Sequence, residues 1–189
     1  MDTESSGPRI TGFRKFPAVG RRCLPDPLKR RTGPPDALGM HGLPDWAWPT
    51  IQVLGFAALG IAHLTVGGPA PPGWTAIGAL VASVGVGLAV WALVVLDTVT
   101  WMPTPTRPEP ATTGPYRRVR HPEYLGQVLL GVGSAILWPS WAAWAAVVVI
   151  ALGFVGRALV EERRMVDVFG AAAVAYHGEV RWRFLPPVF

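Results

Sequence analysis

The fold class is decided by the stretch from Trp74 to Leu96, whose sequence is WTAIGALVASVGVGLAVWALVVL. These 23 residues contain no charged side chain. A helix of roughly 20 apolar residues is long enough to cross the ~30 Å hydrocarbon core of a bilayer. The stretch therefore predicts a transmembrane helix, and the chain is expected to be an integral membrane protein.

Three further apolar runs surround this segment, at 46–66, 124–138 and 141–160. The run at 124–138 has only 15 residues, or about 22 Å as a helix, and it crosses a bilayer only if its polar N-terminal flank enters the interface. Pro139 and Ser140 separate it from the last run by a tight turn. We predict an all-α integral membrane protein with about four transmembrane helices, the last two forming a helical hairpin.

The overall composition supports a membrane protein and limits the other classes. Half of the 189 residues are apolar and 15% are charged, whereas soluble proteins carry about 25% charged residues. The single cysteine, Cys23, excludes a disulfide framework and a thiolate metal cage within one chain. We assign no metal, because His41 and His177 lack partners at ligand spacing, and His63 suits a packed or interfacial histidine.

The charges predict how the chain is oriented in the membrane. The short turns at 67–73 and 139–140 carry no charge, while all Lys and Arg except Arg157 lie in the first 45 residues, in 97–123 or after 160. Cytoplasmic loops of membrane proteins are enriched in Lys and Arg. Both termini and the polar central loop are therefore expected in the cytoplasm, as is a charged C-terminal helix. This placement also accounts for the net charge of +5 without a nucleic-acid partner.

Residues 1–45 are predicted to be a disordered, basic leader. They contain eight Lys or Arg and seven Pro, without hydrophobic periodicity. Residues 46–96 would form two N-terminal transmembrane helices. Residues 97–189 would hold the polar loop, the helical hairpin and the C-terminal tail.

The polar loop contains the first group of residues with chemical potential. Residues 117–126, RRVRHPEYLG, lead into the third apolar run, and Pro122 suits the first turn of a helix. Arg117 and Arg118 are explained as anchors at a headgroup surface. That explanation does not cover three further side chains at the same helix start: His121, Glu123 and Tyr124.

The second group lies at the end of the fourth run. Arg157 and Glu161 are four residues apart, so they share one face of a helix. One reading is a snorkelling arginine paired with an interfacial carboxylate. The other is a functional site, because an ionisable residue within a membrane helix is a functional candidate by default.

The motifs in this half of the chain resemble those of a known family. In order, they are Gly114-Pro115-Tyr116, Arg120-His121-Pro122-x-Tyr124-x-Gly126, Glu161-Glu162, Phe169-Gly170, Tyr176, Val180 and Arg183-Phe184-Leu185-Pro186. The series resembles the isoprenylcysteine carboxyl methyltransferase family, which is related to the phospholipid N-methyltransferases. One position departs from it: the family usually has two tyrosines after Phe-Gly, and here Ala173 stands at the first. Closure of a cofactor pocket is therefore expected to be looser.

The resemblance implies a membrane enzyme that uses S-adenosylmethionine, with residues 97–189 as the cofactor-binding and catalytic region. It implies that Arg157 holds the acceptor substrate. The residues implied to line or bind the cofactor are Pro108, Glu109, Pro110, Ala111, Tyr116, His121, Pro122, Glu123, Tyr124 and Glu161.

Elementary chemistry agrees with these implied roles. Methyl transfer from a sulfonium needs orientation more than acid–base help. A carboxylate such as Glu161 suits the ammonium group of the cofactor, and the faces of Tyr116 and Tyr124 suit its positive charge. A carboxylate acceptor is already nucleophilic at pH 7 and needs only Arg157 to aim it. An amine acceptor would need a base, for which His121 is the nearby candidate.

The leading prediction is thus methyl transfer to a lipophilic acceptor resembling an isoprenylcysteine carboxylate. A phospholipid amine or a thiol stays open as the acceptor, and so do an NADPH-dependent steroid-type reductase and a non-catalytic membrane scaffold. A soluble-type methyltransferase is excluded, because no strand pattern precedes a glycine-rich turn. The expected partners are membrane lipids and a lipophilic small-molecule or lipid substrate, with no obligate protein partner evident.

Overall fold

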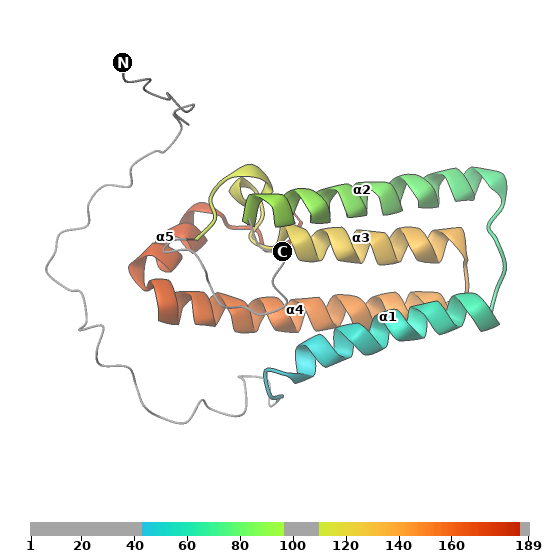
Figure 1. Cartoon of the computed structure of the whole chain (residues 1–189), viewed down its shortest axis with the longest axis horizontal. Coiled ribbons are helices and arrows are strands. Elements are labelled where there is room, and N and C mark those ends of the chain that lie inside the picture. Colours follow the sequence, from blue (N-terminus) through green and yellow to red (C-terminus); the bar gives the residue numbers. More distant parts are fainter. Residues whose placement is uncertain (1–42, 97–109, 186–189) are drawn as a thin grey trace, which may run out of the picture. The chain divides into compact units, whose positions relative to one another are not determined.

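The structure, a computed structural model, describes residues 43–96 and 110–185. Most of the predicted leader, together with Pro108 and Glu109, lies outside these residues. The elements in chain order are α1 (Ala47–Thr65), α2 (Pro72–Leu96), the short 3-10 helix η1 (Gly114–Arg117), α3 (Pro122–Leu137), α4 (Trp141–Phe169) and α5 (Ala171–Glu179). Within the two described ranges there is no strand, and the prediction of an all-α membrane protein is confirmed (Figure 1).

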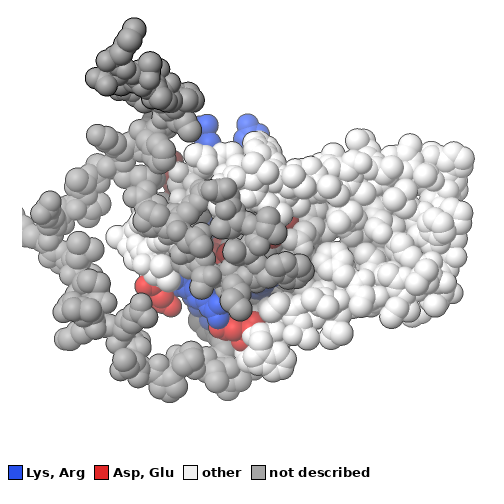
Figure 2. Space-filling view, in the orientation of Figure 1, with Lys and Arg blue, Asp and Glu red and all other residues white. Residues whose placement is uncertain are grey.

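Three of these helices, α1, α2 and α4, are long and apolar enough to span a bilayer. The shorter α3 has 16 residues, or about 24 Å, and it runs alongside α2 (Figure 1). Figure 2 shows charged side chains of the visible face gathered towards one end of the helices, and an uncharged surface over the rest. An uncharged surface along the helices with charges at one end is typical of helices that span a membrane. The side of the membrane on which the charged end lies stays a prediction.

The helices α2 and α3 make backbone contact through glycines spaced seven residues apart. A Cβ atom added at Gly85 would lie 2.6 Å from the carbonyl oxygen of Gly126, and the reverse distance is also 2.6 Å. Gly78 approaches the carbonyl oxygen of Gly133 in the same way, at 2.9 Å. Small residues allow such close approach between membrane helices. The hairpin turn at Pro139 and Ser140 joins α3 to α4 as predicted, but the closest approach of α3 is to α2.

A second seam joins α1 to α4. Gly55 on α1 faces Ile150, whereas Gly153 and Gly156 on α4 face Gln52 and Trp48 of α1. The missing side chains leave room for these larger partners to lie directly on the opposite helix. α4 continues past the predicted end of its apolar run at residue 160, and its charged last turns carry Glu161 and Glu162.

Candidate active site

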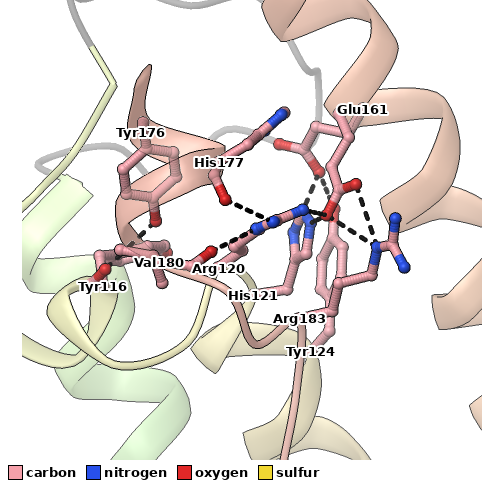
Figure 3. A network of polar contacts seen from close by, with 10 residues as sticks. Tyr116, Arg120, His121, Tyr124, Glu161, Tyr176, His177, Val180 and Arg183 are labelled. Carbon is pink, nitrogen blue, oxygen red and sulfur yellow. Dashed lines mark hydrogen bonds and ion pairs between the residues drawn. The ribbon is translucent and has the colours of Figure 1, made fainter. Parts of the chain in front are cut away.

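The site is built where three segments distant in the sequence meet, beside the N-terminus of α3 (Figure 3). The main chain of residues 119–121 pairs with residues 182–183: the N–H of Arg120 donates to the carbonyl of Trp182 at 2.9 Å, and the N–H of His121 donates to that of Arg183 at 3.0 Å. These bonds hold the loop before α3 against the segment that follows α5. The C-terminal part of the chain thereby fixes the position of His121.

Glu162 is the centre of the polar network and is buried, with 7% of its surface exposed. Its carboxylate accepts from Arg120 Nη1 at 3.1 Å and from Arg183 Nε at 3.0 and 3.1 Å, and His121 Nε2 lies 3.4 Å away. A buried carboxylate is tolerated only with such partners. Glu162 therefore joins α4 to both the loop and the C-terminal segment, and its charge is already compensated by the protein itself.

Arg120 extends this network to α5. Its Nε donates to the carbonyl of Val180 at 2.7 Å, and its Nη2 donates to that of His177 at 2.8 Å. These are carbonyls at a helix end, which have no partner within the helix. The phenol of Tyr176 donates to the carbonyl of Tyr116 at 3.2 Å, and burial raises the pKa of Tyr176, so the phenol keeps its proton.

Glu161, the adjacent residue, has a different environment. Its side chain is 32% exposed, and its carboxylate accepts one hydrogen bond, from the Tyr124 hydroxyl at 2.6 Å. His121 Nδ1 lies 4.0 Å away, and among the described residues no arginine or lysine is within that distance. Glu161 thus differs from Glu162 in that no arginine in the described part of the chain binds it.

Arg157 lies one helical turn before Glu161 on the same face of α4. Its Nη1 donates to Gln52 Oε1 of α1 at 3.2 Å, and its guanidinium carbon lies 5.5 Å from the centre of the Tyr124 ring. The second contact has cation–π geometry. Both Arg157 and Glu161 line one pocket between the start of α1 and the end of the α4 apolar segment. Its lining is Asp45, Trp46, Trp48, Pro49, Arg157, Val160, Glu161 and Arg164.

The aromatic residues form the floor beneath these charges. The rings of His121 and Tyr124 are stacked with centroids 5.3 Å apart, and Phe154 stacks on Tyr124 at 5.0 Å. His121 and Tyr124 are 6% and 4% exposed. Their position is set locally by Pro122, which begins α3 and is itself buried. His121 is therefore a buried member of the network and does not line the pocket.

The structure brings together only part of the predicted site. Arg157, Glu161, Tyr124 and His121 are in contact through the bonds and stacks described above. Glu123 instead accepts from Gln127 on its own helix at 3.2 Å. The remaining predicted residues do not line the pocket in the described part of the chain: Pro110, Ala111, Tyr116 and Pro122.

Four polar residues of the network were not predicted as site residues: Gln52, Arg120, Glu162 and Arg183. Arg120, Glu162 and Arg183 belong to the motifs, so their being ionisable residues within a motif was the sequence signal that could have identified them. Gln52 had only its isolated polarity within an apolar run. In the described ranges, no group of three His, Cys, Asp or Glu side chains is placed to hold a metal ion.

Comparison with known proteins gives one family. Residues 74–172, just over half of the chain, match the family model described as phospholipid methyltransferase. The match begins in α2, well before the motifs, and extends to the start of α5. No curated protein matches the chain significantly. The match supports the broader group of related membrane methyltransferases, and the isoprenylcysteine assignment stays a prediction.

Proposed function

Since the chain belongs to the phospholipid methyltransferase family, we propose that it transfers the methyl group of S-adenosylmethionine to a lipophilic acceptor with a carboxylate head group, such as a prenylated cysteine. The observation that carries this proposal is the pair Arg157 and Glu161. They line one pocket with opposite charges and, among the described residues, form no ion pair with each other.

The residues present fit the cofactor, which members of this family generally use. Glu161 offers an accessible carboxylate whose one strong partner, the Tyr124 hydroxyl, is neutral, so it is suited to the cofactor ammonium. A hydrogen bond to a charged group contributes about 1.5–3 kcal/mol. Glu162 is unsuited to this role, because two arginines already occupy it. When bound, the cofactor supplies an electrophilic methyl group on a sulfonium.

Arg157 is the residue proposed to orient the acceptor. A guanidinium presents parallel donors that match both oxygens of a carboxylate, and the underlying Tyr124 ring limits its motion. A carboxylate needs no base at neutral pH. The pocket opens beside Trp46, which is 69% exposed at the start of a membrane helix. A hydrocarbon tail can therefore stay in the bilayer while the head group reaches Arg157.

An amine acceptor is the second candidate, because the matched family model describes phospholipid methyltransferases. An ammonium head group must lose a proton before it attacks a methyl group. His121 is the predicted base, but it is buried, and its ring nitrogens lie 3.4 Å from Glu162 and 4.0 Å from Glu161. This environment suits a positioning role. The geometry at Arg157 therefore favours the carboxylate.

The experiment uses the full chain in nanodiscs with radiolabelled S-adenosylmethionine. N-acetyl-S-farnesyl-L-cysteine serves as the carboxylate acceptor, and phosphatidylethanolamine serves as the amine acceptor. We expect methyl ester formation on the farnesylated compound. Label found only in the phospholipid would favour the amine acceptor. Absence of cofactor binding, measured by calorimetry, would overturn the proposed function.

A further inference from the structure

Gln52 is a buried polar side chain in the second turn of a membrane helix. It lies on α1 and is 5% exposed, although most neighbouring side chains of this helix are apolar. It packs against the backbone of α4 at Gly153, where an added Cβ would lie 3.0 Å from Gln52 Cγ. The glycine therefore makes room for the glutamine at this one place in the seam between the two helices.

The orientation of the Gln52 amide follows from its partner. A guanidinium can only donate hydrogen bonds, so the amide oxygen must face Arg157 Nη1, at 3.2 Å. The amide Nε2 is buried and has no partner in the part of the chain that the structure describes. Burying an amide with an unsatisfied nitrogen is unfavourable. Packing alone would be served better by an apolar residue, so the contact with Arg157 is the feature that distinguishes Gln52.

Arg157 has a competing partner close by. Glu161 lies four residues further along α4, a spacing at which opposite charges on a helix attract. Within the described residues the two side chains form no ion pair. Arg157 instead contacts Gln52 and the Tyr124 ring, and the Tyr124 hydroxyl donates to Glu161. Two neutral side chains thus engage two opposite charges that would otherwise neutralise each other.

We propose that Gln52 is a positioning residue that holds Arg157 away from Glu161. Because the other charged residues of the pocket, Arg164 and Asp45, pair with each other, the pocket then keeps one positive and one negative group for two different ligands. The inference rests on the proposed function. If Arg157 and Glu161 were paired, the cofactor ammonium would have to displace Arg157, and an anionic acceptor would have to displace Glu161. Both affinities would fall together, although Gln52 contacts neither ligand.

Two substitutions separate this role from packing. Gln52→Met keeps the volume and removes the acceptor atom, so Arg157 is released towards Glu161. In Gln52→Glu, the new carboxylate holds Arg157 in place by an ion pair, but it also neutralises the positive charge of Arg157. Thr50→Val is the matched control. Thr50 lies on the exposed face of the same helix, and its hydroxyl donates to the backbone carbonyl of Trp46, four residues earlier in the chain.

The first measurement needs no ligand. Midpoints of thermal unfolding are measured for Arg157→Met, Glu161→Gln and the double variant, once in the wild-type background and once with Gln52→Met. Coupling between Arg157 and Glu161 should be weak in the wild type, where Tyr124 links them, and stronger with Gln52→Met, since such a cycle isolates the pairwise interaction. Equal coupling in both backgrounds would overturn the inference, whether or not the protein binds the cofactor.

The second measurement is calorimetric titration with S-adenosylmethionine. Gln52→Met should weaken binding about twofold to fivefold, the range expected of a competing ion pair at a half-buried position. This loss should disappear when Arg157 is also replaced by Met. A loss that persists in the double variant would indicate a packing effect and contradict the proposal.

Gln52→Glu gives the opposite pattern. Cofactor affinity should be as in the wild type, while the KM for N-acetyl-S-farnesyl-L-cysteine should rise about tenfold, because Arg157 is neutralised. Thr50→Val should match the wild type in both measurements. Failure of the wild type to bind the cofactor would refute the proposed function, and the unfolding cycle would still decide the role of Gln52.

Discussion

Substitution of the two adjacent glutamates of α4 by glutamine is expected to change two different properties, cofactor affinity for Glu161 and thermal stability for Glu162. Glu161→Gln and Glu162→Gln each replace one carboxylate oxygen by an amide nitrogen at nearly constant shape. Glu161 has one hydrogen bond, from a neutral phenol, and its side chain is 32% exposed. Glu162 accepts from two arginines and its side chain is 9% exposed. The first substitution therefore tests ligand binding and the second tests folding.

The expected magnitudes follow from these environments. Removing one partner of a buried ion pair costs about 3–5 kcal/mol, because the other charge is left uncompensated. Glu162→Gln removes a charged partner from both Arg120 and Arg183. A loss of about 3 kcal/mol corresponds to a midpoint about 6–12 °C lower for a chain of this length. Glu161→Gln should change the midpoint little and should weaken binding of S-adenosylmethionine about 10- to 150-fold, the value of one charge-assisted hydrogen bond.

Both quantities are measured on the same detergent-purified samples. Tryptophan fluorescence reports thermal unfolding, since the chain contains nine tryptophans, and calorimetric titration reports cofactor affinity at a temperature where each variant is folded. Each variant serves as the control for the other. Full cofactor affinity in Glu161→Gln would refute its role at the ammonium group, and an unchanged midpoint in Glu162→Gln would refute the account of the buried network.

Three further outcomes are expected. Arg157→Lys should preserve expression and cofactor binding but lower methyl transfer to a carboxylate acceptor about 10-fold or more, because lysine lacks the planar pair of donors; near wild-type activity would exclude a required two-point contact. Gly126→Ala should lower thermal stability by about 1–3 kcal/mol through overpacking against Gly85, while Gly87→Ala, which meets nothing within 4 Å, should not. Reporter fusions at residue 70 and at the C-terminus should give opposite signals, and identical signals would contradict the predicted orientation.

The pairing of the helices illustrates what the sequence left open. The tight turn at Pro139 and Ser140 predicted that α3 and α4 are consecutive antiparallel helices, and they are. The closest contact of α3 is nevertheless with α2, through glycines seven residues apart on both helices. That spacing is visible in the sequence, but the pairing of the α2 glycines with the α3 glycines depends on how the two helix surfaces pack against each other.

The site residues divide in the same way. The motifs placed Arg157 and Glu161 on one face of a helix, because that relation depends only on helical periodicity. The resemblance and the face shared with Arg157 also selected Glu161 as the carboxylate of the site, but they gave no role to Glu162. Neighbouring residues on a helix point in different directions, and the packing of the C-terminal segment decides which of the two is covered by arginines. No local pattern connects Gln52 with Arg157, which is 105 residues away.

By itself the sequence determined the all-α membrane class and the bounds of the four long helices to within a few residues, with the exception of α4, which continues beyond its apolar run. These features follow from local rules, since a bilayer requires an uninterrupted apolar segment and a turn requires residues that end a helix. The tertiary structure alone decided which helices touch and which carboxylate stays accessible. It also decided which neutral side chains engage Arg157 and Glu161, because those relations depend on contacts between residues far apart in the chain.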